Sequence, residues 1–322
     1  MHRRTALSTL ATLSAAAAIA PGTLRAKTRR DMSDREHPFG VQLFTIPKLV
    51  EADLPGTLAL LAEIGYREVE FFGPYPFSAE ATRESWEGVK GMLGLSDNAF
   101  YGHSPAEVGA MLRDNGLAAP SVHVDLLSLR ENLDALAEGL APLAPQTLVV
   151  PAVDLKLRTT LDDYKRLADD ANAIGRRLGE RGMAFGYHNH GYEHLELSGE
   201  TPLDYLLANT DPEHVRFELD VFWMAAAGAD PVDYLERYPG RFRLIHLKDA
   251  REPFSFPNDG QTPDEWMAGF PLMADPGEGV LDIPAILAAA EASGVEHYYL
   301  ERDLAPEPVE TLRNSYGLLT EM

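Results

Sequence analysis

The stretch from Met183 to Leu195, MAFGYHNHGYEHL, places three histidines, an asparagine and a glutamate directly after a short apolar run. Side chains alternate along a strand, so His188 and His190 share one face if the strand continues that far. Neighbouring imidazoles at the end of a strand suit the binding of a divalent cation or proton transfer. The alternative is a pair of surface histidines in a polar loop.

Polar side chains of the same kind recur at the ends of other apolar runs: Glu70, His123, His188, His190, Asp220, His246 and Glu301. Buried carboxylates and imidazoles are costly without partners, so such positions usually have a counter-charge or a metal. Each residue alone has an ordinary alternative. Asp220 could cap a loop, and His246 could be a satisfied core histidine. Glu301 could pair with Arg302 or with another arginine of the barrel. Their succession across consecutive strands favours one shared site.

The elements that must position these residues alternate between short apolar runs and amphipathic helices. Eight strands are expected, at residues 39–45, 68–72, 121–124, 146–150, 183–188, 215–219, 243–247 and 298–301. Eight alternations predict an α/β fold of the (β/α)8 TIM-barrel type in a single domain. A doubly wound open sheet is the rival, but no G-x-G-x-x-G follows the first strand. Two long segments follow strands, at residues 73–103 and 248–282, and the first is expected to be irregular. Both should form walls or lids over the pocket.

The composition is that of an ordinary globular protein, with 45% hydrophobic and 24% charged residues among 322. Its 28 basic and 50 acidic residues give a net charge of −22, which argues against a nucleic-acid partner. There is no cysteine, so any metal must be held by His, Asp and Glu. Those ligands suit Mn, Co, Fe, Zn or Mg.

The N-terminus is similar to an export signal of the twin-arginine kind. Arg3 and Arg4 precede an uncharged run from Ala6 to Ala20, which is too short and too weakly apolar to predict membrane insertion. We expect a signal peptide over residues 1–26, a flexible lead-in over 27–38 and the catalytic barrel over 39–322. This predicts a periplasmic or secreted protein. The alternative is a disordered or helical tail.

Several segments together resemble the sugar-phosphate isomerase/epimerase superfamily, which has a xylose-isomerase-like TIM barrel. They are GVQLFT at 40–45, GYREVEFFG at 65–73, SVHVD at 121–125, GYHNHGYE at 186–193, ELDVFW at 218–223, IHLKD at 245–249, PGEGVLD at 276–282 and YLERD at 299–303. The segments follow the family's order over almost the whole chain after the signal. The combination is typical of the family but says much less about the substrate.

The resemblance implies a divalent cation held at the ends of strands five to eight by Glu, Asp, His and Glu. Asp220, His246 and Glu301 match the last three positions. The strand-five position falls on His188, where many relatives have glutamate, and His190 is an alternative ligand. Two carboxylates and two imidazoles favour Mn, Zn, Co or Fe over Mg.

The resemblance also implies enolisation of a sugar that chelates the cation through adjacent carbonyl and hydroxyl oxygens. Glu301 or His188 would remove the α-proton of the sugar to give an enediolate, and Lys248 would steer or protonate the sugar oxygens. Because family epimerases use a glutamate on each face of the substrate carbon, His188 leaves one base missing or replaced by imidazole. Substrate contacts are expected from Glu70, His123, His190 and Trp223.

The leading hypothesis is a metal-dependent isomerase or epimerase of a non-phosphorylated sugar or keto-sugar. A lyase or dehydratase acting on a 3-keto-glycoside or inosose through β-elimination is the first alternative. A non-catalytic sugar-binding barrel is the alternative from another class, and a repair endonuclease is disfavoured by the acidic charge. The expected partner is a small-molecule sugar, and the sequence leaves homo-oligomer formation open.

Overall fold

The computed structural model describes residues 38–96 and 99–322. The predicted signal peptide, residues 1–26, lies outside the described residues, as does the lead-in up to residue 37. Both stay predictions. Within the described ranges, no helix is long and apolar enough to cross a membrane.

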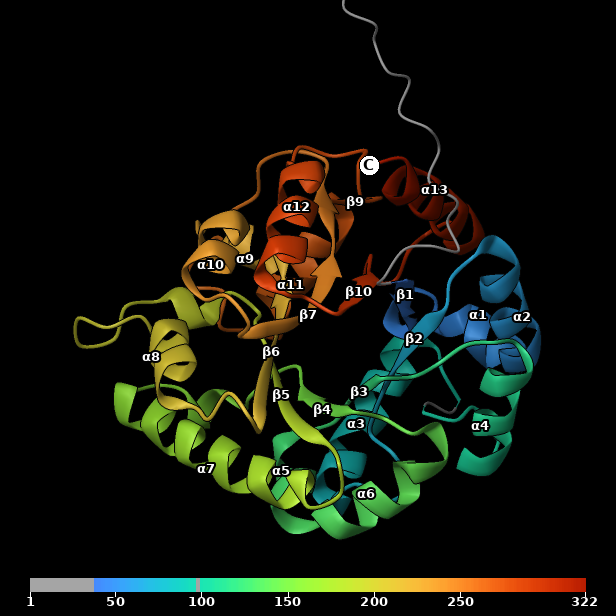
Figure 1. Ribbon diagram of the computed structural model, residues 1–322, viewed down its shortest axis with the longest axis horizontal. Coiled ribbons are helices and arrows are strands. Elements are labelled where there is room, and N and C mark those ends of the chain that lie inside the picture. The colour runs from blue at the N-terminus through green and yellow to red at the C-terminus, as the bar shows by residue number, and fades with distance from the viewer. Residues whose placement is uncertain (1–37, 97–98) are drawn as a thin grey trace, which may run out of the picture. The chain divides into compact units, whose positions relative to one another are not determined.

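Eight parallel strands close into a barrel, in the order β1-β10-β7-β6-β5-β4-β3-β2. The predicted (β/α)8 barrel is therefore confirmed (Figure 1). Its strands are β1 (Phe39–Gln42), β2 (Glu68–Phe72), β3 (Ser121–His123), β4 (Thr147–Val150), β5 (Ala184–His188), β6 (Val215–Asp220), β7 (Phe242–Leu247) and β10 (His297–Leu300). A separate antiparallel pair, β8 (Asp249–Ala250) and β9 (Met273–Ala274), lies in the long segment after β7.

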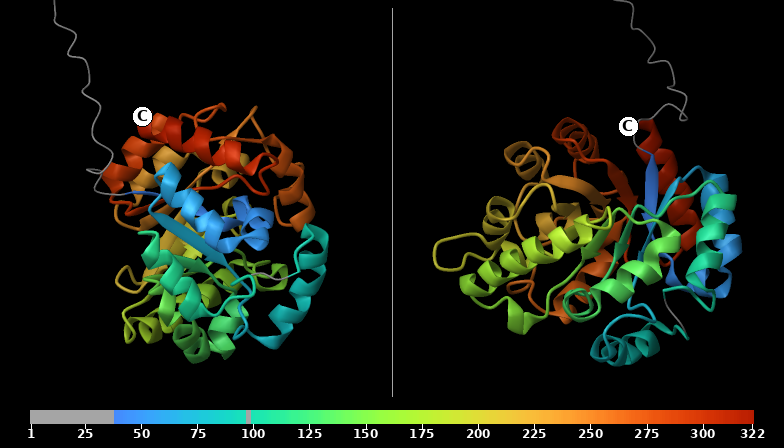
Figure 2. Two further views of the ribbon diagram at one scale, coloured as in Figure 1. Left: turned by 90° about the vertical axis from the view of Figure 1, so that its right-hand side faces the viewer. Right: turned by 60° about the horizontal axis from the view of Figure 1, so that its bottom comes forward.

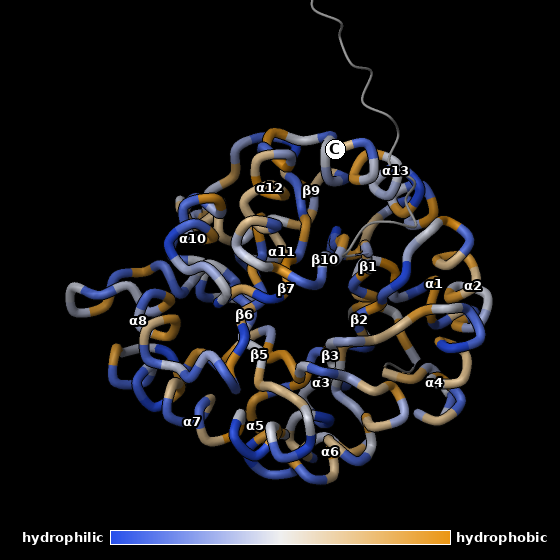
Figure 3. Tube along the Cα trace, viewed as in Figure 1, coloured by the Kyte–Doolittle hydropathy of each residue, from blue (hydrophilic) through white to orange (hydrophobic). Residues whose placement is uncertain are grey.

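Helices cover the outside of the barrel, and hydrophilic and hydrophobic segments alternate along them (Figure 3). The main ones are α1 (Pro47–Ala52), α2 (Leu54–Ile64), α4 (Pro105–Asp114), α5 (Leu126–Glu131), α6 (Leu133–Leu140), α7 (Leu161–Gly179), α8 (Pro202–Asn209), α9 (Val221–Ala226), α10 (Pro231–Arg237), α12 (Ile283–Ser293) and α13 (Pro308–Glu321). Their starts follow the sequence closely. Ser104 caps α4 in a capping box with Glu107, as the Ser-Pro pair predicts.

Two local predictions are wrong. Segment 73–103, expected to be irregular, contains the helix α3 (Glu80–Leu93), whose described residues are mostly exposed. The sequence does not predict this helix, because it contains Gly88 and Gly91 and has only a weak apolar stripe. The first strand ends at Gln42 rather than Thr45, because Leu43–Thr45 turn into a 3-10 helix capped by the Gln42 side chain.

The segment after β7 also holds more structure than expected: α11 (Pro263–Gly269) and a 3-10 turn at Phe270–Leu272. Figure 2 shows α3 and α11 at the same end of the barrel. This is the end at which β2 and β7 finish, so the predicted location of walls or lids agrees with the fold.

The register of the strands sorts the barrel interior by height. Val149, Leu244 and Tyr299 form a buried apolar layer inside the barrel. Toward the carboxyl ends of the strands, inward positions become polar: His246 lies two residues beyond Leu244 on β7, and His188 of β5 pairs in register with Glu218 of β6. The barrel therefore has an apolar floor beneath a polar layer at its carboxyl end.

Gly186 occupies an inward position below His188, where no side chain fits. A Cβ there would lie 2.7 Å from Val149 Cγ2 and 2.8 Å from Thr147 Cγ2. We expect Gly186→Ala to lower the free energy of unfolding by about 1–3 kcal/mol through overpacking. Chemical denaturation measures the change. Gly88→Ala is the control, because its Cβ meets nothing within 4 Å in an exposed helix. A gain of about 0.5–1 kcal/mol is expected there, and equal effects at both sites would contradict this account.

Candidate metal centre

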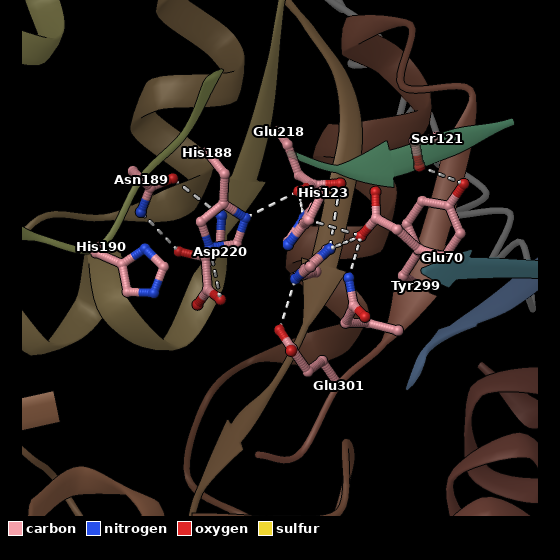
Figure 4. Close-up of polar contacts among 12 residues, drawn as sticks. Glu70, Ser121, His123, His188, Asn189, His190, Glu218, Asp220, Tyr299 and Glu301 are labelled. Atoms are coloured by element: carbon pink, nitrogen blue, oxygen red, sulfur yellow. Dashed lines mark hydrogen bonds and ion pairs between the residues drawn. The ribbon is translucent and has the colours of Figure 1, made fainter. Parts of the chain in front are cut away.

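The carboxyl ends of the strands bring imidazoles and carboxylates together above the apolar floor (Figure 4). The strand β6 supplies two of them, Glu218 and Asp220, because alternate residues of a strand share a face. A β-bulge between Phe217 and Glu218 shifts the register of β6 against β7. As a result Asp220 pairs with His246 at the mouth.

His246 is the centre of this cluster. Its Nδ1 lies 2.6 Å from Glu301 Oε2, and its Nε2 lies 2.7 Å from Glu70 Oε2. The same Nε2 is 3.1 Å from Glu218 Oε1. The imidazole is completely buried. Both ring nitrogens therefore meet carboxylates.

The Glu218 carboxylate links two further histidines. Its Oε2 lies 2.9 Å from His123 Nε2 and 2.9 Å from His188 Nδ1. The other nitrogen of His188, Nε2, is 3.5 Å from Asp220 Oδ2. Together with Glu70 and His246, residues of five strands, β2, β3, β5, β6 and β7, thus contribute to one network of hydrogen bonds and ion pairs.

Asp220 serves two purposes. Its Oδ1 accepts a hydrogen bond of 2.9 Å from the backbone N–H of Trp223 and so caps α9. Its other oxygen, Oδ2, does not take part in the cap and lies 3.0 Å from Lys248 Nζ. The capping alternative is therefore observed, and the role of Asp220 as a metal ligand stays a prediction.

Lys248 brings a buried cation to the same place. Its Nζ lies 2.8 Å from Glu301 Oε2 and 2.8 Å from Asp303 Oδ2, besides its contact with Asp220. The ammonium is 1% exposed, so it is paired because an isolated buried charge would be too costly. The alternative pairing of Glu301 with Arg302 is not made, since Arg302 binds Asp275.

Two overlapping groups could hold a cation: His123, His188, Glu218 and His246, and Asp220, His246 and Glu301. In each group the donor atoms lie within 4.8 Å of one another. Among the residues the structure describes, Glu70 Oε1 is buried without a hydrogen-bond partner beside them. Imidazole nitrogens with carboxylate oxygens suit Mn, Fe, Co or Zn, so the residues present fit a divalent ion.

Burial and neighbouring charges oppose each other in this network. Burial lowers the pKa of His246, but the charges of Glu218 and Glu301 outweigh it and raise that pKa well above its usual value. Burial also lowers the pKa of His123, and Glu70 and Glu218 raise it to about 9. At His188 burial wins and the pKa is lowered. Burial raises the pKa of Glu301, but Lys248 and His246 bring it well below the usual range.

The metal-free protein should become less stable as pH rises. His123 has a folded pKa of about 9, above the unfolded value near 6.5, so its contribution is complete below pH 6.5. That contribution is lost as pH rises through about 9. We expect the unfolding free energy of chelated wild type to fall, relative to His123→Asn, by on the order of 3 kcal/mol across this range. Parallel urea curves at each pH measure the difference, and a constant difference would contradict the assignment.

The structure separates two of the predicted residues from this network. His190 lies beside His188, with ring centroids 4.8 Å apart, but belongs to neither metal group (Figure 4). Trp223 is 1% exposed in a separate apolar cluster, with Lys248 Nζ 5.4 Å from its ring. Their sugar contacts stay predictions.

Sequence reasoning missed Glu218, Asp303 and Gln42. Gln42 Nε2 donates to Glu70 Oε2 at 2.7 Å, and Asp303 holds Lys248. Glu218 lies two residues before Asp220, so the alternation of side chains along the strand could have found it. Nothing comparable marks Asp303, which lies beyond its strand.

Comparisons with known proteins agree with this architecture. Residues 58–314 match the family model of the xylose isomerase-like TIM barrel. Over 151 residues the chain is 30% identical to an inosose dehydratase from Lacticaseibacillus casei. The matched residues make up 46% of this chain and 49% of that protein. The chain therefore spans about half the length of this curated relative.

Solved structures share the whole barrel. A sugar phosphate isomerase/epimerase from Parabacteroides distasonis is 24% identical, with a TM-score of 0.69 over 89% of this chain and 94% of that chain. The IolI protein with a bound zinc atom is 15% identical, with a TM-score of 0.61 over 88% and 95% of the two chains. At these identities the likeness shows the fold.

Proposed function

The chain belongs to the xylose isomerase-like TIM barrel family, and from that premise we propose that it is a metal-dependent lyase. It would enolise a keto-cyclitol or keto-sugar and eliminate water from it. The observation that carries this proposal is the contact of Lys248 Nζ with Glu301 Oε2 at 2.8 Å beside the candidate metal ligands. A base and an acid standing side by side are what a β-elimination needs.

The metal would be held by Asp220, His246 and Glu301, with His188 adjoining Asp220. A divalent ion there would act as a Lewis acid for negative charge that develops on the substrate carbonyl oxygen. The zinc in the IolI protein supports such a site in a barrel of the same fold. The identity of the ion in this chain is part of the proposal.

The side chains supply the proton transfers. The Glu301 carboxylate removes the proton from the carbon next to the carbonyl, and the electron pair of that C–H bond moves toward the carbonyl. Lys248 then donates a proton to the hydroxyl on the next carbon. The C–O bond breaks, a C=C bond forms and water leaves. Glu70, with an unpartnered buried oxygen, would accept a hydrogen bond from another substrate hydroxyl.

Two observations favour elimination over isomerisation or epimerisation, and the second of them counts against epimerisation alone. The relative with 30% identity is named an inosose dehydratase. In addition, reversal of a stereocentre requires bases on both faces of the carbon, whereas the second such position here is His188, whose Nδ1 is tied to Glu218. Isomerase or epimerase chemistry remains the second candidate, because the Parabacteroides distasonis protein of the same fold carries that name. The net charge of −22 favours uncharged substrates.

The test uses purified protein loaded with Mn²⁺ and offered 2-keto-myo-inositol in D2O. Elimination predicts a product lighter by one water by mass spectrometry. A product that has lost no water and is heavier only by incorporated deuterium, with new sugar signals by NMR, would instead assign the isomerase or epimerase. Neither product nor deuterium exchange, with Mn²⁺, Zn²⁺, Co²⁺ or Fe²⁺, would contradict an enolising enzyme acting on this substrate class.

A further inference from the structure

The segment between β8 and β9, residues 251–272, is called the lid segment below. The antiparallel pair β8 and β9 forms its neck, with Asp249 opposite Ala274 and Ala250 opposite Met273. The near part of the lid segment packs on α9. There the Phe256 ring stacks on Trp223 at 5.7 Å, and the Phe256 N–H donates to Ala226 O at 3.3 Å.

The far part of the lid segment reaches across the ends of β6 and β5 to the segment after β4. Arg158, the residue that ends the 3-10 turn Leu155–Leu157, makes this contact. Its Nη2 donates to Gln261 O at 2.6 Å, and its Nη1 donates to Gln261 Oε1 at 3.3 Å. Its Nε donates to Val153 O at 2.7 Å. One side chain thus joins two segments that are far apart in sequence.

Arg158 is also stacked and buried. Its guanidinium carbon lies 3.6 Å from the centroid of the Tyr192 ring, and the residue is only 3% exposed. The Tyr192 hydroxyl in turn accepts from Val153 N at 3.1 Å. A planar guanidinium can stack with its face while its edge donates in several fixed directions, which an ammonium cannot do. The contact therefore requires arginine.

The contacts of Arg158 with Val153, Gln261 and Tyr192 are called the clasp below. The clasp sets the position of Trp266 in α11. The Trp266 ring lies 4.8 Å from the His190 ring and 6.0 Å from the Tyr192 ring. His190 is in turn 4.8 Å from His188, in the candidate metal centre. The buried Nδ1 of His190 has no hydrogen-bond partner among the described residues. The lid segment therefore covers the β5 side of the site.

We propose that Arg158 is a positioning residue that holds the lid segment closed over the reaction site. The inference rests on the proposed function only for its effect on turnover; the closure itself is a property of the fold. Closing a site excludes water and fixes the substrate, so release of the clasp should affect both kcat and KM.

The test compares Arg158→Ala and Arg158→Lys with the control Arg251→Ala. Arg251 is exposed at the start of the lid segment, so its loss changes the same charge without touching the clasp. Amide hydrogen exchange over residues 253–270 and acrylamide quenching of Trp266 report closure without any substrate. The Trp266 signal is the difference between each protein and the same protein carrying Trp266→Phe.

Arg158→Ala is expected to speed amide exchange in the lid segment roughly tenfold and to raise quenching of Trp266. With Mn²⁺ and 2-keto-myo-inositol, kcat/KM should fall roughly tenfold or more, with KM raised. Arg158→Lys should open the lid segment partly, because its point-like donor cannot serve Val153 and Gln261 together.

Equal exchange and quenching in Arg158→Ala and Arg251→Ala would overturn the proposal. If the alanine variant fails to fold, wild-type protection in Arg158→Lys would overturn it instead. If the lid segment opens in Arg158→Ala and kcat/KM is unchanged, closure of the lid segment does not affect the reaction, and that part of the proposal is refuted. If wild type turns over no 2-keto-myo-inositol, the proposed function fails for this substrate, while exchange and quenching still decide the role of Arg158.

Discussion

His246→Ala is expected to empty the metal site. His246 belongs to both groups of candidate ligands and contacts Glu70, Glu218 and Glu301. Even partners of metal ligands contribute 10–100-fold to affinity, so loss of a central ligand should weaken metal binding by more than about a hundredfold. Metal-free His246→Ala should also unfold more easily, by about 3–5 kcal/mol, because carboxylates are left buried without their cation. Elemental analysis and titration with Mn²⁺ measure the first effect, and urea unfolding measures the second.

The matched control is His297→Ala. His297 is also a buried histidine inside the barrel, paired with Glu68 at 3.0 Å, but it lies at the amino end of β10. It should keep wild-type metal content. A stoichiometric metal ion in His246→Ala, or equal loss in both variants, would refute the assignment of the centre.

Glu301→Gln is expected to stop the chemistry while leaving the fold intact. The amide keeps the size of the side chain and one ligating oxygen, but it cannot take a proton. Loss of a general base should lower kcat by about 10²–10⁴-fold. Steady-state turnover of 2-keto-myo-inositol and deuterium exchange at the carbon next to the carbonyl both measure the loss.

The variant Glu68→Gln controls for removal of a buried carboxylate. Glu68 is held by His297 at the far end of the barrel and should be dispensable for turnover. Metal content of Glu301→Gln must be measured alongside, because an empty site would explain the same loss. Near wild-type turnover in metal-loaded Glu301→Gln would exclude Glu301 as the base.

Glu218 supplies a negative charge beside His188, the strand-five position at which the family resemblance implies a glutamate. Where many relatives are expected to have glutamate, this chain has His188, and the adjacent strand β6 places Glu218 Oε2 2.9 Å from His188 Nδ1. A carboxylate is therefore present on this side of the mouth, one strand further along. The His188–Glu218 pair is oriented by a hydrogen bond, as metal-ligating histidines generally are.

The sequence predicts the barrel well because its strands are short apolar runs with regular spacing. It also predicts the convergence of Asp220, His246 and Glu301, since parallel strands of a barrel end at one face. The helix α3 escaped prediction because its glycines and polar residues carry no clear stripe. Asp303 and Arg158 could not be found, since their partners Lys248 and Gln261 are set by how loops fold back.

The most direct test of the central claim is deuterium exchange from D2O into 2-keto-myo-inositol, compared between Mn²⁺-loaded and chelator-treated protein. The account predicts exchange next to the carbonyl in the loaded protein, its loss on chelation and its return when Mn²⁺ is restored. Equal exchange with and without the metal would contradict a metal-dependent enolisation at this site.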